Sequence, residues 1–123
     1  MFRADDYVKV SDLAEAYGLC QKRSSLVVGG MVWMKMTHIT KRTIVDLSGL
    51  GLDEIEEKEG EFSIGCMCSL HQLETHEGLN RYFDGIFREC TRNIVGVQMR
   101  NCATVGGSIF ARFGFSDILT CLL

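Results

Sequence analysis

The 123-residue chain contains no proline, no low-complexity segment and no apolar run near the roughly 20 residues of a membrane span. Its 13 Lys and Arg residues are scattered and its net charge is −3, so it lacks the clustered basic surface of a nucleic-acid-binding protein. No secretory leader is recognisable in the acidic first residues, which predicts a cytoplasmic protein. With 46% hydrophobic and 24% charged residues, the composition is that of one soluble globular domain spanning residues 1–123.

Common nucleotide-binding and hydrolase motifs are also missing. No G-x-G-x-x-G follows a strand, and neither G-x-x-x-x-G-K-[ST] nor G-x-S-x-G occurs. The chain therefore has no Rossmann fingerprint and no P-loop. A Ser/His/Asp hydrolase has little support, because nothing in the sequence positions Ser108, Asp117 and a histidine together.

The six cysteines predict small, reduced and buried side chains rather than disulfides or metal ligands. Cys66 and Cys68 are one residue apart, whereas zinc sites use two-residue gaps in pairs. His71 and His76 lack the i, i+4 spacing of two ligands on one helical face. We therefore expect exposed helical histidines and no metal site.

In the first half of the chain, two short β-branched runs predict buried parallel strands over residues 25–28 and 43–47, each followed by a glycine-containing turn. Residues 10–18 predict a short helix that Ser11 caps and Gly18 ends. Together these elements predict a small βαβ-like lobe over about residues 1–50.

In the second half, residues 52–60 predict an exposed acidic edge strand with a turn, and the alternation from Phe62 to Cys68 predicts another strand. Ser69 and Gln72 form a capping box that opens a helix through about Glu77. Apolar residues then recur every three or four positions, which predicts one long amphipathic helix from about residue 79 to residue 99. A final helix follows from Asp117.

The fold class is therefore α+β, in two lobes. The second lobe, over about residues 51–123, is predicted to hold a mixed or antiparallel sheet with helices.

Two glycine pairs are the main functional signal. Gly29-Gly30 follows the first buried strand, and Gly106-Gly107 lies between the hydroxyls of Thr104 and Ser108. Consecutive backbone N–H groups in a glycine turn converge on an anion such as a diphosphate, and glycine lets the main chain approach it closely. Two such turns predict a clamp on one pyrophosphate, with Asp117 facing a ribose or ribityl hydroxyl, although an isolated glycine pair is more often only a turn.

Beyond these patterns, five segments resemble the flavin-binding domain of the molybdenum hydroxylases, the family that includes xanthine dehydrogenase and aerobic carbon monoxide dehydrogenase. They are similar to its first flavin loop, the strand after it, its Ile-Gly-Ala strand, its second flavin loop and the Ser-Asp pair beyond. The segments are Leu26–Gly30, Ile44–Ser48, Phe62–Cys66, Gln98–Ile109 and Ser116–Asp117.

The resemblance implies a two-lobed FAD-binding domain of the PCMH type, in which two loops wrap the FAD diphosphate and ribityl chain. Asp117 would add a carboxylate contact, and Ile94 falls where the family places an apolar residue beside the flavin. The loop residues would be Leu26, Val27, Val28, Gly29, Gly30, Met31, Val32 and Trp33, with Thr104, Val105, Gly106, Gly107 and Ser108.

The implied activity is electron transfer. Iron–sulfur clusters would pass electrons from a molybdenum centre to FAD, which delivers them to NAD or another acceptor. The implied partners are a molybdenum-cofactor subunit and a 2Fe–2S subunit, and no residue of this chain would act as an acid or base catalyst.

The sequence also departs from the family. The first loop continues Met31-Val32-Trp33 where Thr-Asp is usual after the glycines, so only backbone donors remain there, and Ser108 stands where Asn is common. The family continues past the Asp117 helix with further strands, so we expect a C-terminally truncated domain.

Two alternatives stay open. One is a non-catalytic remnant that binds other proteins and holds no flavin. The other is a flavin oxidase with covalently held FAD, although the loops offer no His or Cys for that attachment.

Overall fold

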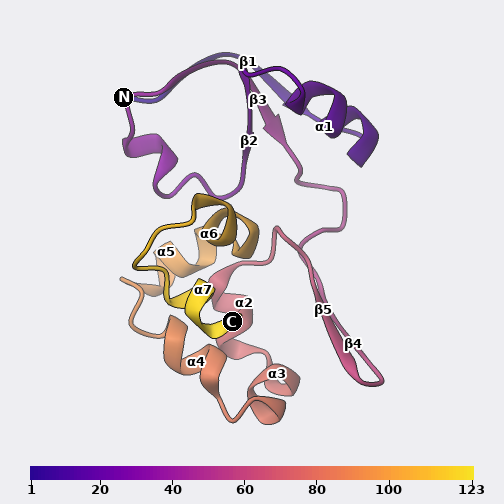
Figure 1. The fold of residues 1–123 in the computed structure, drawn as a ribbon, viewed down its shortest axis with the longest axis vertical. Coiled ribbons are helices and arrows are strands. Elements are labelled where there is room, and N and C mark those ends of the chain that lie inside the picture. Colours follow the sequence, from indigo (N-terminus) through magenta and orange to yellow (C-terminus); the bar gives the residue numbers. More distant parts are fainter.

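A three-stranded parallel sheet with one covering helix forms lobe one of the computed structural model, which describes residues 1–123 throughout (Figure 1). The strand order is β1-β3-β2, and Leu26 pairs with Ile44 in parallel register, which confirms the two predicted strands. The elements are β1 (Arg3–Lys9), α1 (Leu13–Cys20), β2 (Ser25–Val28), the 3-10 turn η1 (Met34–Met36) and β3 (Thr40–Asp46). The strand β1 was not predicted, because this exposed edge strand carries two aspartates and no apolar run.

The two predicted ends of the first helix are wrong. Asp12, not Ser11, is the N-cap residue: its carboxylate accepts the N–H of Glu15 at 2.8 Å. The Glu15 carboxylate in turn accepts the N–H and hydroxyl of Ser11, at 2.8 and 3.0 Å. Gly18 lies inside the helix, which continues to Cys20, and Gln21 is its C-cap residue.

Lobe two consists of an antiparallel hairpin, which projects to one side, and six short helices (Figure 1). The hairpin confirms the predicted exposed acidic strand. The capping box is also confirmed, since Gln72 donates its N–H to Ser69 Oγ at 3.1 Å and Ser69 donates its N–H to Gln72 Oε1 at 2.7 Å. The elements are β4 (Ile55–Lys58), β5 (Glu61–Ile64), α2 (Leu70–Thr75), α3 (Glu77–Tyr82), α4 (Ile86–Thr91), α5 (Val97–Cys102), α6 (Val105–Ala111) and α7 (Asp117–Cys121).

The strand predicted from Phe62 to Cys68 is shorter than expected and ends at Ile64. Beyond it the chain folds back, and Met67 donates its N–H to the carbonyl of Leu52 at 2.8 Å. None of the helices has the length and apolar character that crossing a bilayer requires.

The prediction of one long helix over residues 79–99 is wrong, because α3, α4 and α5 share this region. The chain turns between α3 and α4 at Asp84 and Gly85, whose φ angles are 51° and 78°. The buried Asn80 side chain satisfies the backbone at this break: its oxygen accepts the N–H of Arg88 at 3.0 Å, and its nitrogen donates to three carbonyls of α2 and the turn after it. Apolar residues at helical spacing therefore reach the core from several short helices.

The two lobes have separate hydrophobic cores. Lobe one buries Val10, Ala16 and Val45, and every half-buried residue packed on them also belongs to lobe one. Lobe two buries a larger cluster: Cys68, Leu70, Leu73, Leu79, Phe87, Val105 and Ile118. No hydrogen bond or ion pair joins residues 1–50 to residues 51–123. The mixed α/β architecture, with one parallel and one antiparallel sheet, confirms the predicted fold class.

Several side-chain predictions are corrected. Only Cys68 is buried among the six free cysteines; Cys20, Cys66 and Cys102 are exposed, and Cys90 and Cys121 are half-buried. Burial raises the pKa of both the Cys68 and Cys90 thiols.

The two histidines predicted to be exposed are half-buried, since each has a local partner. His71 Nδ1 lies 3.0 Å from the Glu74 carboxylate, and His76 Nδ1 accepts the N–H of Leu79 at 3.1 Å to cap α3.

Candidate functional site

The first predicted loop begins at the carboxyl end of a parallel strand. Val28, the last residue of β2, is buried, and Gly29-Gly30 follow it directly. In open α/β sheets, ligands bind in the crevice outside the carboxyl ends of the strands. Leu26 and Val27 lie further back in β2, paired with β3, so they support the loop from the sheet.

The structure brings the two predicted glycine segments into contact. A Cβ on Gly29 would collide with the hydroxyl of Thr104, and one on Gly30 would overlap the carbonyl of Cys102. Both glycines are therefore needed for lobe one to reach lobe two at this point. We call this contact, between Gly29-Gly30 and residues 102–104, the interlobe seam.

The first loop offers a continuous set of hydrogen-bond donors. None of the five backbone N–H groups from Gly29 to Trp33 donates to another group of the chain. Met31 has a left-handed backbone with φ of 57°, a conformation that non-glycine residues adopt only when the surrounding structure imposes it. Successive free N–H groups in such a turn can hold an anion such as a diphosphate.

The second predicted glycine turn is in fact the first turn of a helix. Val105, Gly106 and Gly107 begin α6, and Thr104 is its N-cap. The N–H groups of these three residues are already bonded, to the carbonyls of Cys68 and Cys66 at 2.8 Å each and to Thr104 Oγ1 at 3.2 Å.

This segment therefore contributes to a site mainly through its side chains and its close packing. The Ser108 hydroxyl donates a hydrogen bond to the Thr104 carbonyl at 2.9 Å. The hydroxyl of Thr104, which faces Gly29, still has its proton to donate. Gly106 is needed for packing, because a Cβ there would lie 2.7 Å from the carbonyl oxygen of Cys66.

Ile94 and Asp117 share no hydrogen bond with either glycine segment. Ile94 packs half-buried against the lobe-two core, with its carbonyl held by Arg100 Nη1 at 3.3 Å. Asp117 is exposed at the first position of α7, which Ser116 caps. The roles predicted for these two residues beside a flavin stay predictions.

An ion pair that the sequence did not reveal holds the second segment in place. Arg100, on α5, donates to the carboxylate of Glu74, on α2, through Nε at 2.8 Å and Nη2 at 3.2 Å. These hydrogen bonds from Arg100, and then the one from His71, hold the pKa of the Glu74 carboxyl below its ordinary value. Because α5 ends at Cys102, the pair fixes the residues that meet Gly29 and Gly30.

An aromatic cluster at the lobe boundary was also missed. Trp33 packs on Phe113 and Phe115, which follow α6, with ring centroids 5.5 and 5.8 Å apart. Phe113 and Phe115 were not predicted as site residues, and the signal that marks them is an aromatic pair two residues apart just before Ser116-Asp117.

The surface has two hollows outside the glycine segments. A small pocket of about 130 Å³ lies between the end of β3 and lobe two, lined by residues that include Ser48, Asp53 and Met67. A larger groove of about 660 Å³ lies between the hairpin and α3, away from the glycine segments, with Phe62 and Tyr82 among its lining residues. No group of three or more His, Cys, Asp or Glu side chains is arranged to hold a metal ion.

Known proteins share this fold and sequence. The chain is 31% identical over 116 residues to the aldehyde oxidoreductase FAD-binding subunit PaoB of Escherichia coli (strain K12), a match that covers 89% of this chain and 36% of that protein. Its structure is similar to that of the Cu,Mo-CO dehydrogenase in its cyanide-inactivated form, with a TM-score of 0.74 and 24% identity over 85% of this chain and 39% of that one. Quinoline 2-oxidoreductase from Pseudomonas putida 86 has a TM-score of 0.71 and 21% identity, over 88% of this chain and 38% of that one.

The likenesses to solved structures show the fold, and the chain spans little more than a third of the length of these relatives. The model of a protein family described as "FAD binding domain in molybdopterin dehydrogenase" matches residues 1–123. This match confirms the resemblance found in the sequence: the chain belongs to the family of FAD-binding domains in molybdopterin dehydrogenases.

Proposed function

We propose that this chain binds FAD at the interlobe seam and serves as the electron-transfer component of a molybdenum hydroxylase complex. The observation that carries the proposal is the run of five free backbone donors from Gly29 to Trp33, at the carboxyl end of a parallel strand and opposite the Thr104 hydroxyl. This donor set suits a diphosphate and does not depend on the Thr-Asp side chains that Met31 and Val32 replace.

In this proposal the residues bind and orient the cofactor. The N–H groups of the first loop hold the phosphate oxygens, and Thr104 donates its hydroxyl from the facing lobe. Val105 is buried in the lobe-two core, and Gly106 packs on Cys66. Both contacts hold the neighbouring Thr104 in position opposite Gly29. FAD itself supplies the electron-transfer chemistry when bound, and the protein supplies binding, orientation and electrostatics.

The rest of the assembly follows from the same proposal. PaoB is by name the FAD-binding subunit of an aldehyde oxidoreductase, which supports the view that this chain also works with other subunits. The proposed partners are a molybdenum-cofactor subunit and a 2Fe–2S subunit in a cytoplasmic, xanthine-dehydrogenase-like complex, and NAD is one proposed electron acceptor. Gly107, Ser108, Ile94 and Asp117 remain proposed contacts to the ribityl chain and flavin.

The proposal is tested on the purified chain by its visible spectrum and by titration with FAD. Bound oxidised flavin absorbs at about 450 nm, and added FAD should lose its fluorescence on binding. Gly30→Ala should weaken binding, because the new Cβ forces the seam apart at Cys102. Gly18→Ala, on α1 and away from the seam, is the matched control, since its Cβ meets no atom within 4 Å. A protein that takes up no FAD, or a Gly30→Ala variant that binds like the control, contradicts the proposal.

The alternative function, a protein-interaction module without flavin, has one observation in its favour. The groove beside the hairpin is lined by apolar side chains that include Tyr82 and Phe83, which are 72% and 42% exposed. Exposed apolar surface of this kind often marks a protein interface. The same titration separates the two functions, because the module would bind no FAD.

A further inference from the structure

The lobes of this protein meet without polar contacts. No hydrogen bond or ion pair crosses between them, and their cores are separate. Besides the close approach of Gly29 and Gly30 to residues 102–104, the aromatic contacts that cross the boundary are those of Trp33 with Phe113 and Phe115. Apart from the connecting chain, the seam and these three rings are therefore among the contacts that can set the position of one lobe relative to the other.

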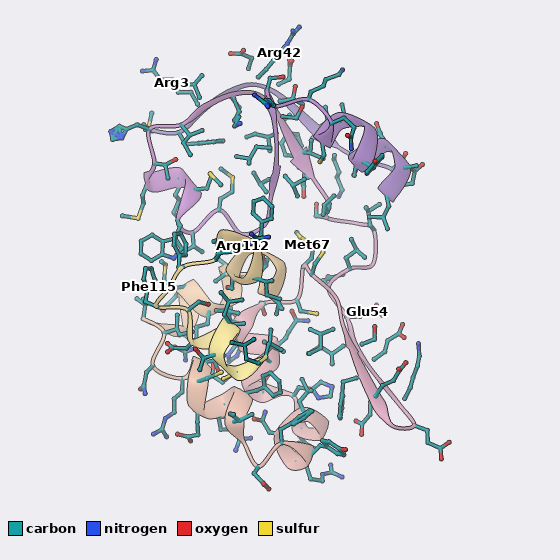
Figure 2. The ribbon with its side chains drawn as sticks, viewed as in Figure 1. Arg3, Arg42, Glu54, Met67, Arg112 and Phe115 are labelled. Carbon is teal, nitrogen blue, oxygen red and sulfur yellow. The ribbon has the colours of Figure 1, made fainter.

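The three rings form one compact group, which we call the aromatic bridge. Trp33 is tilted by 51° and 53° to the other two, and Phe113 and Phe115 stack on each other at 5.2 Å with their planes 8° apart. These separations are in the range in which aromatic rings attract one another beyond the effect of burial alone. Figure 2 shows Phe115 at the side of the molecule, at the level where the lobes meet.

The aromatic bridge connects the far end of the first predicted loop to the segment between α6 and α7. Trp33 is the last residue of the free-donor run, and Phe113 and Phe115 lie between α6 and the Ser116 cap of α7. The seam joins the loops at Gly29-Gly30. A second contact at Trp33 therefore stops the first loop from rotating about the seam.

The backbone turns through a left-handed residue on each side of the bridge. Met31 and Arg112 are both non-glycine residues with left-handed φ angles, 57° and 50°, and they lie just before Trp33 and Phe113. Arg112 is the C-cap residue of α6, where a left-handed conformation commonly ends a helix. Met31 lies in the free-donor loop, where such a conformation is uncommon for a residue other than glycine.

We propose that Trp33, Phe113 and Phe115 are positioning residues, and that their rings hold the lobes at the spacing at which the Gly29–Trp33 donors and the Thr104 hydroxyl reach one ligand. The inference rests on the proposed FAD site, and it names residues that act through the loop backbone rather than through the flavin. Trp33 and Phe115 remain 58% and 67% exposed, so the bridge is a reversible contact and not a core.

Trp33 is the single tryptophan of the chain, so its fluorescence reports on the bridge directly. The test compares the double variant Phe113→Leu/Phe115→Leu with Phe110→Leu, an 80% exposed ring on α6 that is not part of the bridge. Without flavin, acrylamide quenching of Trp33 should rise by up to about twofold in the double variant, since 58% of the ring is already exposed. The Phe110→Leu variant should be quenched like the wild type.

With FAD, the double variant should bind about tenfold more weakly, because each lost aromatic pair costs a few-fold in the population of the closed arrangement. Phe110→Leu should bind like the wild type. Unchanged quenching in the double variant overturns the bridge, and unchanged FAD affinity overturns its positioning role. A wild-type protein that binds no FAD removes the proposed function and the positioning role together, while the quenching comparison still decides whether the bridge exists.

A second pair of variants covers the case in which the double variant does not fold, which far-UV circular dichroism would reveal. Trp33→Ala should lose about as much FAD affinity as the double variant, and Trp33→Phe should recover it to within about twofold, because a ring at this position restores the contact. Equal binding by all three proteins, or failure of Phe to rescue, would contradict the role of the ring.

Discussion

Replacing Glu74 by Gln should destabilise lobe two by about 2–3 kcal/mol. Breaking a buried ion pair by removing one partner costs about 3–5 kcal/mol, because the remaining charge is left uncompensated. The Arg100 and Glu74 side chains are only 10% and 15% exposed, so this value applies. The expected effect is at or below its lower end, because the Gln oxygen can still accept one of the two guanidinium hydrogen bonds.

The effect should extend to the interlobe seam. The Glu74–Arg100 pair joins α2 to α5, and α5 leads directly into Cys102, whose carbonyl packs on Gly30. A looser α5 lets this carbonyl move, which changes the separation of the two proposed FAD loops. Glu74→Gln should therefore weaken FAD binding as well as lobe-two stability.

Urea denaturation followed by far-UV circular dichroism measures the effect, since most of the helices belong to lobe two. A double-mutant cycle with Arg100→Met isolates the pair, and its coupling energy should exceed about 1 kcal/mol. A loss below about 1 kcal/mol on Glu74→Gln, the size expected for an exposed pair, would refute the claim that the pair holds α5.

The same carboxylate predicts a pH dependence. Hydrogen bonds from Arg100 and then His71 lower the pKa of Glu74 from its ordinary value of 4.5. A group whose pKa is lower in the folded state stabilises the fold above its unfolded pKa and loses that contribution as the pH falls through the folded one. Wild-type lobe two should therefore lose stability as the pH drops below 4.5, and Glu74→Gln should show a flatter acid dependence.

Three further changes test the fold. Ser69→Ala removes half of the capping box and should cost about 1 kcal/mol in urea denaturation, whereas no loss would mean the cap is dispensable. Leu73→Ala, at a fully buried site, should cost about 2–5 kcal/mol in lobe two by urea denaturation, and a loss below about 1 kcal/mol would contradict its place in the core. Iodoacetamide should label the exposed Cys66 well before the buried Cys68, whose thiol pKa is raised, and mass spectrometry of the labelled peptides would expose the reverse order.

Local chemistry carried the correct parts of the sequence analysis. The β-branched runs around Leu26 and Ile44, and the capping box of Ser69 with Gln72, depend on residues close together in the chain, and the structure confirms each of them. The resemblance to the flavin-binding family also came from continuous segments. Several of the wrong expectations, by contrast, depended on what distant residues do.

The helix breaks illustrate the difference. The apolar spacing between residues 79 and 99 predicts one helix, yet Asp84 and Gly85 adopt left-handed φ angles and the side chain of Asn80 bonds the backbone of Arg88. The broken arrangement lets the short helices pack on α2 and α7 and bury apolar residues from several directions. Periodicity along the chain contains no information about this choice.

The glycine pairs show where local sequence and tertiary structure divide. The sequence alone gives glycine at positions 29, 30, 106 and 107, and the absence of a Cβ there allows another group to approach the backbone closely. Only the folded chain shows what approaches: for the first pair it is Thr104 and Cys102 from the other lobe, and for Gly106 it is Cys66. The donors of Gly29–Trp33 are free, whereas those of Val105–Gly107 are used, because hydrogen-bond partners are chosen by three-dimensional neighbours that local sequence does not name.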